Sequence, residues 1–150
     1  MSPAAPRLAV RAVIRDGNRV LVVNAFPDPG RDLWCLPGGG VEAGSSLTDN
    51  LRREVAEETG LTIVPGPICH VGEFRDPDSG FHQVELVFLA TVTGGVLDPA
   101  HRDPQGVVHA RRFVTAGELA DLRFKPDALP DLAFGTPPRI TPAALVRMAR

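Results

Sequence analysis

The segment SLTDNLRREVAEETGL, residues 46–61, carries the clearest local signals for the fold. Ser46 is a good N-cap residue, Asp49 follows three positions later, and Gly60 is a good C-terminal stop. These signals predict a helix over residues 46–59, with both of its ends marked in the sequence.

One side of this helix mixes apolar residues with carboxylates. A stripe of three aliphatic residues should face the core: Leu47, Leu51 and Val55. At about 100° per residue, Glu54 and Glu58 lie within roughly 20° of Leu47, and Glu57 lies at the edge of the stripe. A carboxylate directed toward apolar packing loses hydration unless a cation or hydrogen-bond donors replace it.

A divalent cation is the natural compensation, because Mg²⁺ prefers oxygen ligands and bridges protein carboxylates to substrate phosphates. The helix would supply the oxygens, and Arg53 could hold one carboxylate in its productive rotamer. The alternative is that REVAEE, residues 53–58, is a solvated acidic face with an Arg53–Glu57 pair four residues apart.

The rest of the chain predicts a mixed sheet with helices on its faces, an α/β fold. Two β-branched runs between Leu8 and Asn24, separated by the turn sequence Asp16-Gly17-Asn18, predict a hairpin. FPDPGRD, residues 26–32, predicts a surface loop. Further strands are expected at residues 33–36, 61–74, 82–92 and 107–114, with a turn at DPDSG, residues 76–80.

The C-terminal part is less regular. Thr115 and Glu118 form a capping-box pattern ahead of a short helix that reaches about Leu122. Residues 126–140 are proline-rich and predicted to be irregular, and Thr141-Pro142 predicts the start of a last short helix. Without an internal repeat or a boundary, residues 1–150 are expected to form a single domain.

Composition excludes several classes of protein. The hydrophobic content of 43% and charged content of 23% are typical of a globular protein. The net charge of −2 and pI near 6.1 provide no basic field, so stable nucleic-acid binding is not expected. The sequence shows no apolar run of membrane-spanning length and no signal peptide. The two cysteines, Cys35 and Cys69, suit a reducing compartment, so we expect a cytoplasmic protein.

The sequence of residues 39–61 resembles that of the Nudix hydrolases. Their box runs G-x5-E-x7-R-E-U-x-E-E-x-G-U, where U is a bulky aliphatic residue. This chain reads Gly39, then Ser45, then Arg53-Glu54-Val55-Ala56-Glu57-Glu58-Thr59-Gly60-Leu61, which matches eight of the nine specified positions. The lead-in LPGGGVEAG also looks like that of the family, and the resemblance extends from the first hairpin to the Thr115 helix.

The resemblance implies a Nudix-type α/β/α sandwich with a mixed β-sheet. It also implies metal-dependent hydrolysis of a pyrophosphate bond in a nucleoside diphosphate linked to another group, such as ADP-ribose, a nucleotide sugar or a nucleoside triphosphate. Water would attack one phosphorus, with Mg²⁺, or alternatively Mn²⁺, as the cofactor.

Residue roles follow by analogy. Glu57 and Glu58 would be the main metal ligands, joined by the carbonyl of Gly38. Glu54 would be a further ligand or the general base that takes a proton from water. The catalytic set is therefore Glu54, Arg53 and Glu57, and the metal set is Gly38, Glu54, Glu57 and Glu58. Some members carry the base on a loop outside the box.

One departure from the family pattern concerns the metal. Ser45 stands where the family usually has the first Glu of the box, and a hydroxyl binds a hard cation far more weakly than a carboxylate. One metal site is therefore expected to be altered or missing. Glu42 could substitute only if its loop brings it in; otherwise it is a solvated loop residue.

Substrate recognition is weakly specified. The candidates are Arg75, Phe81, Asp103 and Gln105. Asp103 and Gln105 belong to the loop DPAHRDPQG, where a solvated turn is the alternative. Other side chains that could contact a nucleotide are Phe26, Trp34, Phe74, His82 and Glu85, each with a packing or surface role as the alternative. Pro77 resembles the placement in members that act on ADP-ribose, but it is also ordinary turn chemistry.

A second hypothesis is a catalytically weak nucleotide-binding sensor module of the same fold, which Ser45 favours. The expected partner in both cases is a small-molecule nucleotide, without a membrane or a stable nucleic-acid complex. Many relatives are dimers, so a homodimer is a further expectation. The four histidines show no paired metal-ligand spacing and are expected to be structural or solvated.

Overall fold

The computed structural model describes residues 4–26 and 32–148. Its elements are, in chain order, β1 (Arg7–Asp16), β2 (Arg19–Phe26), β3 (Leu33–Cys35), β4 (Gly38–Gly40), α1 (Leu47–Thr59), β5 (Thr62–Arg75), β6 (His82–Gly94), β7 (Ala110–Thr115), α2 (Ala116–Ala120), β8 (Phe124–Lys125) and α3 (Leu129–Phe134). Most of the predicted 26–32 loop, residues 27–31, and the side chain of Phe26 lie outside the described residues.

Strand β1 organises a mixed sheet. The strand order is β5-β6-β1-β2-β3-β8, with β4 also pairing with β1 and β7 with β2. Strand β6 runs parallel to β1 over eight residues, from Arg7 to Ile14. On its other edge β1 changes partner, because Ala9–Arg11 pairs with β4 whereas Arg15–Asp16 pairs with β2. The sheet therefore curls around β1.

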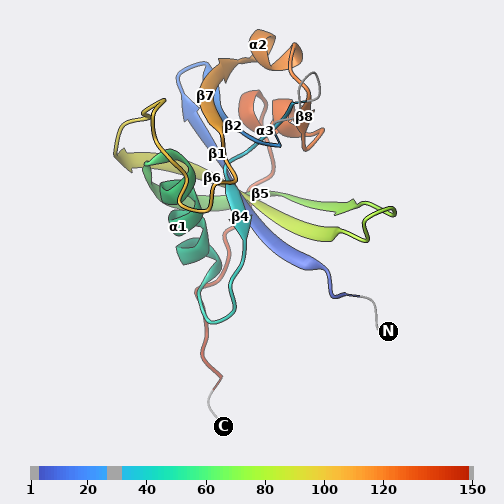
Figure 1. The fold of residues 1–150 in the computed structure, drawn as a ribbon. Helices are drawn as coiled ribbons and strands as arrows, with labels where there is room; N and C mark the ends of the chain where they lie inside the picture. Colours follow the sequence, from blue (N-terminus) through green and yellow to red (C-terminus); the bar gives the residue numbers. More distant parts are fainter. Residues whose placement is uncertain (1–3, 27–31, 149–150) are drawn as a thin grey trace.

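Side chains of β1 alternate between two cores because successive residues of a strand point to opposite faces. Val10, Ala12 and Ile14 pack with Leu51 and Val55 of α1. On the opposite face lies a second cluster, which joins Val13 to residues of α2 and α3, namely Leu119, Leu129, Leu132 and Ala133. Figure 1 shows α1 on one side of the sheet and α2 with α3 on the other. The predicted α/β fold with a mixed sheet between helices is confirmed.

Local predictions hold best in the first 94 residues. The hairpin of β1 and β2 turns at Gly17, whose φ of 60° lies in the left-handed region that glycine tolerates. The pair β5 and β6 forms along the predicted strands. Strand β4 was not predicted, because a run of three glycines carries no side-chain pattern.

The C-terminal predictions need two corrections. Helix α3, Leu129–Phe134, lies inside the segment 126–140 that we predicted to be irregular; Pro130 is in its first turn, where the missing N–H costs nothing, and Leu129 and Leu132 are buried. The short helix predicted from Thr141 does not form in residues 141–148. Leu145, Val146 and Met148 are exposed there, so no core contact stabilises a helix.

None of the helices in the described residues has the length and apolar character that a membrane crossing requires.

Candidate active site

Helix α1 carries two buried carboxylates among its core residues. The Ser46 side chain accepts a hydrogen bond from the Asp49 N–H at 3.1 Å, and Gly60 closes the helix with a φ of 75°. Leu51 and Val55 are fully buried. Glu54 and Glu58 are only 7% and 5% exposed, as the periodicity of the helix predicted. The solvated acidic face is therefore excluded for these two residues.

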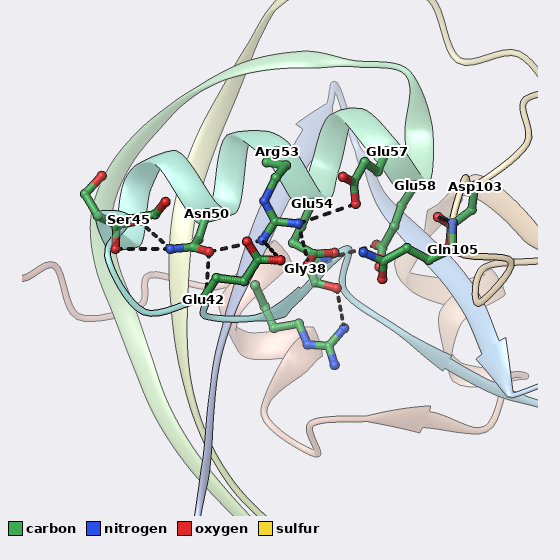
Figure 2. Close-up of polar contacts among 12 residues, drawn as sticks. Gly38, Glu42, Ser45, Asn50, Arg53, Glu54, Glu57, Glu58, Asp103 and Gln105 are labelled. Carbon is green, nitrogen blue, oxygen red and sulfur yellow. Dashed lines mark hydrogen bonds and ion pairs between the residues drawn. The ribbon is translucent and has the colours of Figure 1, made fainter.

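Arg53 links the carboxylates of the helix. Its Nη1 lies 3.2 Å from Glu54 Oε1 and 3.5 Å from Glu57 Oε2 (Figure 2). Glu57 is the more accessible of the pair, with a side chain 26% exposed. Its Oε2 is nevertheless buried and accepts no hydrogen bond from the described residues. One guanidinium thus restrains two carboxylates and leaves an oxygen of Glu57 incompletely satisfied.

The glycine strand β4 closes over these carboxylates. The Gly38 N–H donates to Glu58 Oε2 at 3.0 Å, and the Gly38 carbonyl accepts from Arg11 Nη1 at 3.2 Å. Gly38 has a φ of 144°, and a Cβ there would collide with the backbone of β1. A Cβ on Gly39 would lie 2.6 Å from the Glu54 carboxyl. The lead-in glycines are required because the backbone approaches the carboxylates so closely.

Burial makes these carboxylates hard to ionise. It raises the pKa of Glu58 to about 8, against the opposing effects of the Gly38 N–H and Arg11. Burial also raises the pKa of Glu54, although Arg53 acts in the opposite direction. Both carboxylates therefore hold their protons to a higher pH than an exposed glutamate does.

The C-terminal end of α1 is held by residues distant in sequence. Arg111 of β7, 8% exposed, donates through Nε to the Glu58 carbonyl and through Nη1 to the His101 carbonyl, both at 2.6 Å. The His101 ring lies 2.7 Å from the Glu57 carbonyl oxygen. These contacts satisfy helix carbonyls that have no partner inside the helix, and they fix the turn that carries Glu57 and Glu58.

The side chains of this site fit a divalent cation. Across residues 4–26 and 32–148, no group of three or more His, Cys, Asp or Glu side chains already converges as a metal site. The donors that α1 does offer are carboxylate oxygens of Glu54, Glu57 and Glu58, and one of them is buried without a hydrogen bond. Mg²⁺ uses one or two protein carboxylates and completes its shell with water and substrate phosphates, so convergence of three ligands is not required.

A pocket of about 420 Å³ lies beside Arg11, whose Nη1 binds Gly38. Its lining is mainly apolar and includes Leu33, Leu36, Phe74, Phe81 and Val107, together with five polar or charged residues, Arg7, Arg11, Gln83, Glu85 and Lys125. Arg7 Nη1 donates to Gln83 Oε1 at 2.7 Å. Arg11 Nε lies 3.5 Å from Glu85 Oε2, while Glu85 Oε1 accepts no hydrogen bond from the described residues. An apolar pocket with a few buried polar groups is typical of a small-molecule site.

The predicted substrate residues lie in different places. Phe81 lines the pocket and is 45% exposed. Arg75 is exposed at the end of β5 and is absent from the pocket lining. Asp103 anchors its own loop, because its carboxylate accepts from the N–H groups of Gln105, Val107 and Val108. Gln105 is exposed, and Figure 2 shows its side chain directed back toward the helix that carries Glu58.

The other candidates separate in the same way. Phe74 and the buried Glu85 line the pocket. Trp34 packs against the core of the α2–α3 face, and the Arg112 guanidinium lies 4.9 Å from its ring centre. His82 pairs with Glu73 at 2.8 Å on the surface, and Pro77 lies in an exposed turn.

The sequence interpretation missed Arg7, Arg11 and Gln83. A signal for Arg11 was present, since an arginine in the apolar run LAVRAVI must either point to solvent or be paired inside. Its side chain is only 14% exposed and its guanidinium contacts Glu85, Leu36 and Gly38. No comparable signal marked Gln83. It lies two residues before Glu85 and therefore on the same face of β6, but the sequence did not indicate which face of that strand is buried.

A family model, the NUDIX domain, matches residues 5–132 of the chain. The chain belongs to the Nudix family. The match includes β1, the glycine strand β4, helix α1 and the pocket residues, so the resemblance of the box extends to the whole arrangement.

Individual relatives of this Nudix chain are moderately similar. It is 34% identical over 92 residues to an ADP-ribose pyrophosphatase of Methanocaldococcus jannaschii, a match covering 61% of this chain and 54% of that protein. It is 37% identical over 84 residues to an 8-oxo-dGDP phosphatase of Homo sapiens, covering 56% of this chain and 24% of the relative. The matches thus span about half of the first relative and about a quarter of the second.

Solved structures show the same fold. A MutT NUDIX hydrolase from Burkholderia pseudomallei superposes with a TM-score of 0.70 at 23% identity, covering 87% of this chain and 99% of that one. A MutT protein from Methanosarcina mazei Go1 superposes with a TM-score of 0.65 at 26% identity, covering 87% and 92%.

Proposed function

We propose that this Nudix protein hydrolyses a pyrophosphate bond in a nucleoside diphosphate linked to another group, using a divalent cation. The observation that carries the proposal is the set of three glutamates on α1, two of them buried, with a Glu57 oxygen that accepts no hydrogen bond from the described residues and has only Arg53, at 3.5 Å, as an ion-pair partner. Such groups are costly in a folded protein unless a cation compensates them. ADP-ribose, a nucleotide sugar and a nucleoside triphosphate are the substrate classes that we retain.

Glu57 and Glu58 are the proposed metal ligands, with Glu54 and the Gly38 carbonyl as additional oxygens. A bound Mg²⁺, or alternatively Mn²⁺, would neutralise the pyrophosphate and stabilise charge on the departing phosphate. The Gly38 carbonyl now accepts from Arg11, so this oxygen has to share its lone pairs between the two.

The chain's own residues carry the remaining steps. Arg53 restrains Glu54 and Glu57. Water forms a bond to one phosphorus while the bond from that phosphorus to the bridging oxygen breaks. If Glu54 is not a metal ligand, it is the proposed base that takes the proton of that water.

The pocket beside Arg11 is the proposed nucleoside site. Phe74 and Phe81 offer aromatic faces to a base, and Arg11 lies between the pocket and Gly38. Gln105, directed toward α1, remains a proposed substrate contact, whereas Asp103 holds the loop that presents it. Arg75 would act only on a part of the substrate outside the pocket.

The test is turnover of a panel containing ADP-ribose, nucleotide sugars, 8-oxo-dGDP and nucleoside triphosphates, with Mg²⁺, Mn²⁺ or chelator. The expected result is metal-dependent cleavage that Glu57→Gln/Glu58→Gln abolishes. Glu73→Gln, an exposed glutamate that pairs with His82 on the surface, is the matched control and should retain activity.

The second candidate is a nucleotide sensor of the same fold, which Ser45 favours. It predicts that one compound binds and raises the melting temperature without being cleaved. That outcome, with folded and metal-loaded protein, would reject the hydrolase.

A further inference from the structure

The box position that usually carries a glutamate holds Ser45. Arg53 nevertheless has polar partners in and beside the loop that contains Ser45. Ser45 is exposed, and its backbone carbonyl accepts a hydrogen bond from Asn50 Nδ2 at 3.3 Å. The residue therefore contributes to the site through its backbone. The charge that the family supplies at this position has to come from elsewhere in the loop or be absent.

Asn50 connects the loop, the helix and Arg53. It is fully buried, and its Nδ2 donates to the carbonyls of Ser45 and Ser46, the latter at 2.8 Å. Its Oδ1 accepts from the Glu42 N–H at 2.9 Å and from Arg53 Nη2 at 3.1 Å. A buried amide with four hydrogen bonds restrains the positions of its partners, because losing any one of these bonds leaves a buried polar group unsatisfied.

Glu42 places a carboxylate close to Arg53. Its backbone N–H is held by Asn50, and its carboxylate Oε1 lies 3.6 Å from Arg53 Nη2 (Figure 2). The Arg53 guanidinium is therefore held on both sides. Nη2 faces Asn50 and Glu42, while Nη1 faces Glu54 and Glu57. A planar guanidinium held on one edge presents its other edge in a fixed direction.

We propose that Glu42 and Asn50 replace the absent box glutamate as positioning residues: together they orient Arg53, which in turn orients Glu54 and Glu57. The consequence is that Ser45 does not weaken the metal site, in contrast to the expectation from the box alone. The inference rests on the proposed hydrolase activity for its main readout.

The competing account is that Glu42 forms an ordinary surface ion pair, since its side chain is 67% exposed. The same helix contains a matched example of such a pair. Asp49 Oδ1 lies 3.2 Å from Arg52 Nη1, and the Asp49 side chain is 70% exposed. Among the described residues, Arg52 forms no ion pair with a carboxylate of the site, so Asp49→Asn removes an equivalent charge without disturbing Arg53.

The experiment compares Glu42→Gln, Asp49→Asn and Glu42→Gln/Ser45→Glu with the unchanged protein. Glu42→Gln should lower kcat about two- to fivefold, the range of an exposed ion pair, with little change in KM. It should also weaken Mg²⁺ binding measured by calorimetry. Asp49→Asn should match the unchanged protein in both readouts. Adding Ser45→Glu to Glu42→Gln should restore both, because a carboxylate then returns to the usual box position.

Equal kcat and equal Mg²⁺ affinity in Glu42→Gln and Asp49→Asn would overturn the proposal, as would a failure of Ser45→Glu to restore either readout. If no compound is cleaved by the unchanged protein, the hydrolase proposal falls, while Mg²⁺ affinity still decides the role of Glu42. If the unchanged protein also fails to bind Mg²⁺ and Mn²⁺, both proposals fall.

Discussion

The two ends of helix α1 are held by different kinds of contact. Its N-terminal end is fixed by near neighbours, the Ser46 cap and the Asn50 contacts with Glu42, Ser45 and Ser46. Its C-terminal end is fixed by Gly38, 20 residues from Glu58, and by Arg111, 53 residues away. The proposed metal ligands lie on the end that depends on the tertiary fold.

This difference has a physical consequence. Local contacts are formed whenever the helix forms, so damage to them should cost little beyond the lost hydrogen bond. Distant contacts at the other end close the sheet, the loop and the helix around buried carboxylates, where an unpaired group is expensive. Damage at the C-terminal end should therefore cost more.

The largest expected effect is on the pH dependence of the free energy of unfolding, and it comes from the buried Glu58 carboxyl. Glu58, with a pKa of about 8, holds its proton more tightly in the folded state than in the unfolded chain, where its ordinary value is 4.5. The unfolded chain thus releases the proton first as pH rises. The free energy of unfolding of the metal-free protein should fall from about pH 5 to about pH 8, by at most about 1.4 kcal/mol per pH unit.

Urea unfolding in chelator at several pH values measures this decline. Glu58→Gln should flatten much of it, while the raised pKa of Glu54 and Glu85 leaves a smaller remainder of the same sign. Mg²⁺ should stabilise the protein more at pH 8 than at pH 5, because a cation binds the ionised carboxylate. A decline of full size in Glu58→Gln would show that Glu58 is not its source.

A smaller effect is expected from Arg111→Met, which keeps much of the side-chain volume but removes every donor. The carbonyls of Glu58 and His101 lose charged donors at 2.6 Å, and Val108 loses one at 3.4 Å. We expect the free energy of unfolding to fall by about 2–4 kcal/mol.

The neighbouring Arg112→Met is the matched control for that measurement. Arg112 is exposed and stacks on Trp34, a contact expected to contribute about 0.5–1 kcal/mol. If the two variants lost equal stability, the contacts of Arg111 would not be what holds the C-terminal end of α1.

Much of this site could be predicted from the sequence because its signals are local. The helix period placed Glu54 and Glu58 on the buried side, and the spacing around Gly60 marked the helix end. The roles of Arg111, His101 and Asp103 could not be predicted. Their partners are backbone groups, and a backbone N–H or carbonyl has no residue identity for a sequence pattern to reveal.

The fold shows the same division. Strands β1, β2, β5 and β6 follow β-branched runs between turns, and these were predicted. Helix α3 was missed because the prolines of residues 126–140 suggested a loop, while the stability of the helix comes from burying Leu129 and Leu132 against the sheet. The helix expected from Thr141 has good local signals but lacks such a surface to pack against.

The smallest expected effect comes from the N-terminal end of α1. Ser46→Ala removes the side-chain acceptor of the Asp49 N–H but leaves the Ser46 carbonyl that Asn50 binds. The free energy of unfolding should fall by about 1 kcal/mol, the usual cost of an N-cap, and kcat should stay within about twofold because Arg53 keeps its partners. Urea unfolding and steady-state kinetics measure the two quantities. A loss as large as that of Arg111→Met would contradict the comparison, because it would mean that the locally held end supports the site as strongly as the end held by the tertiary fold.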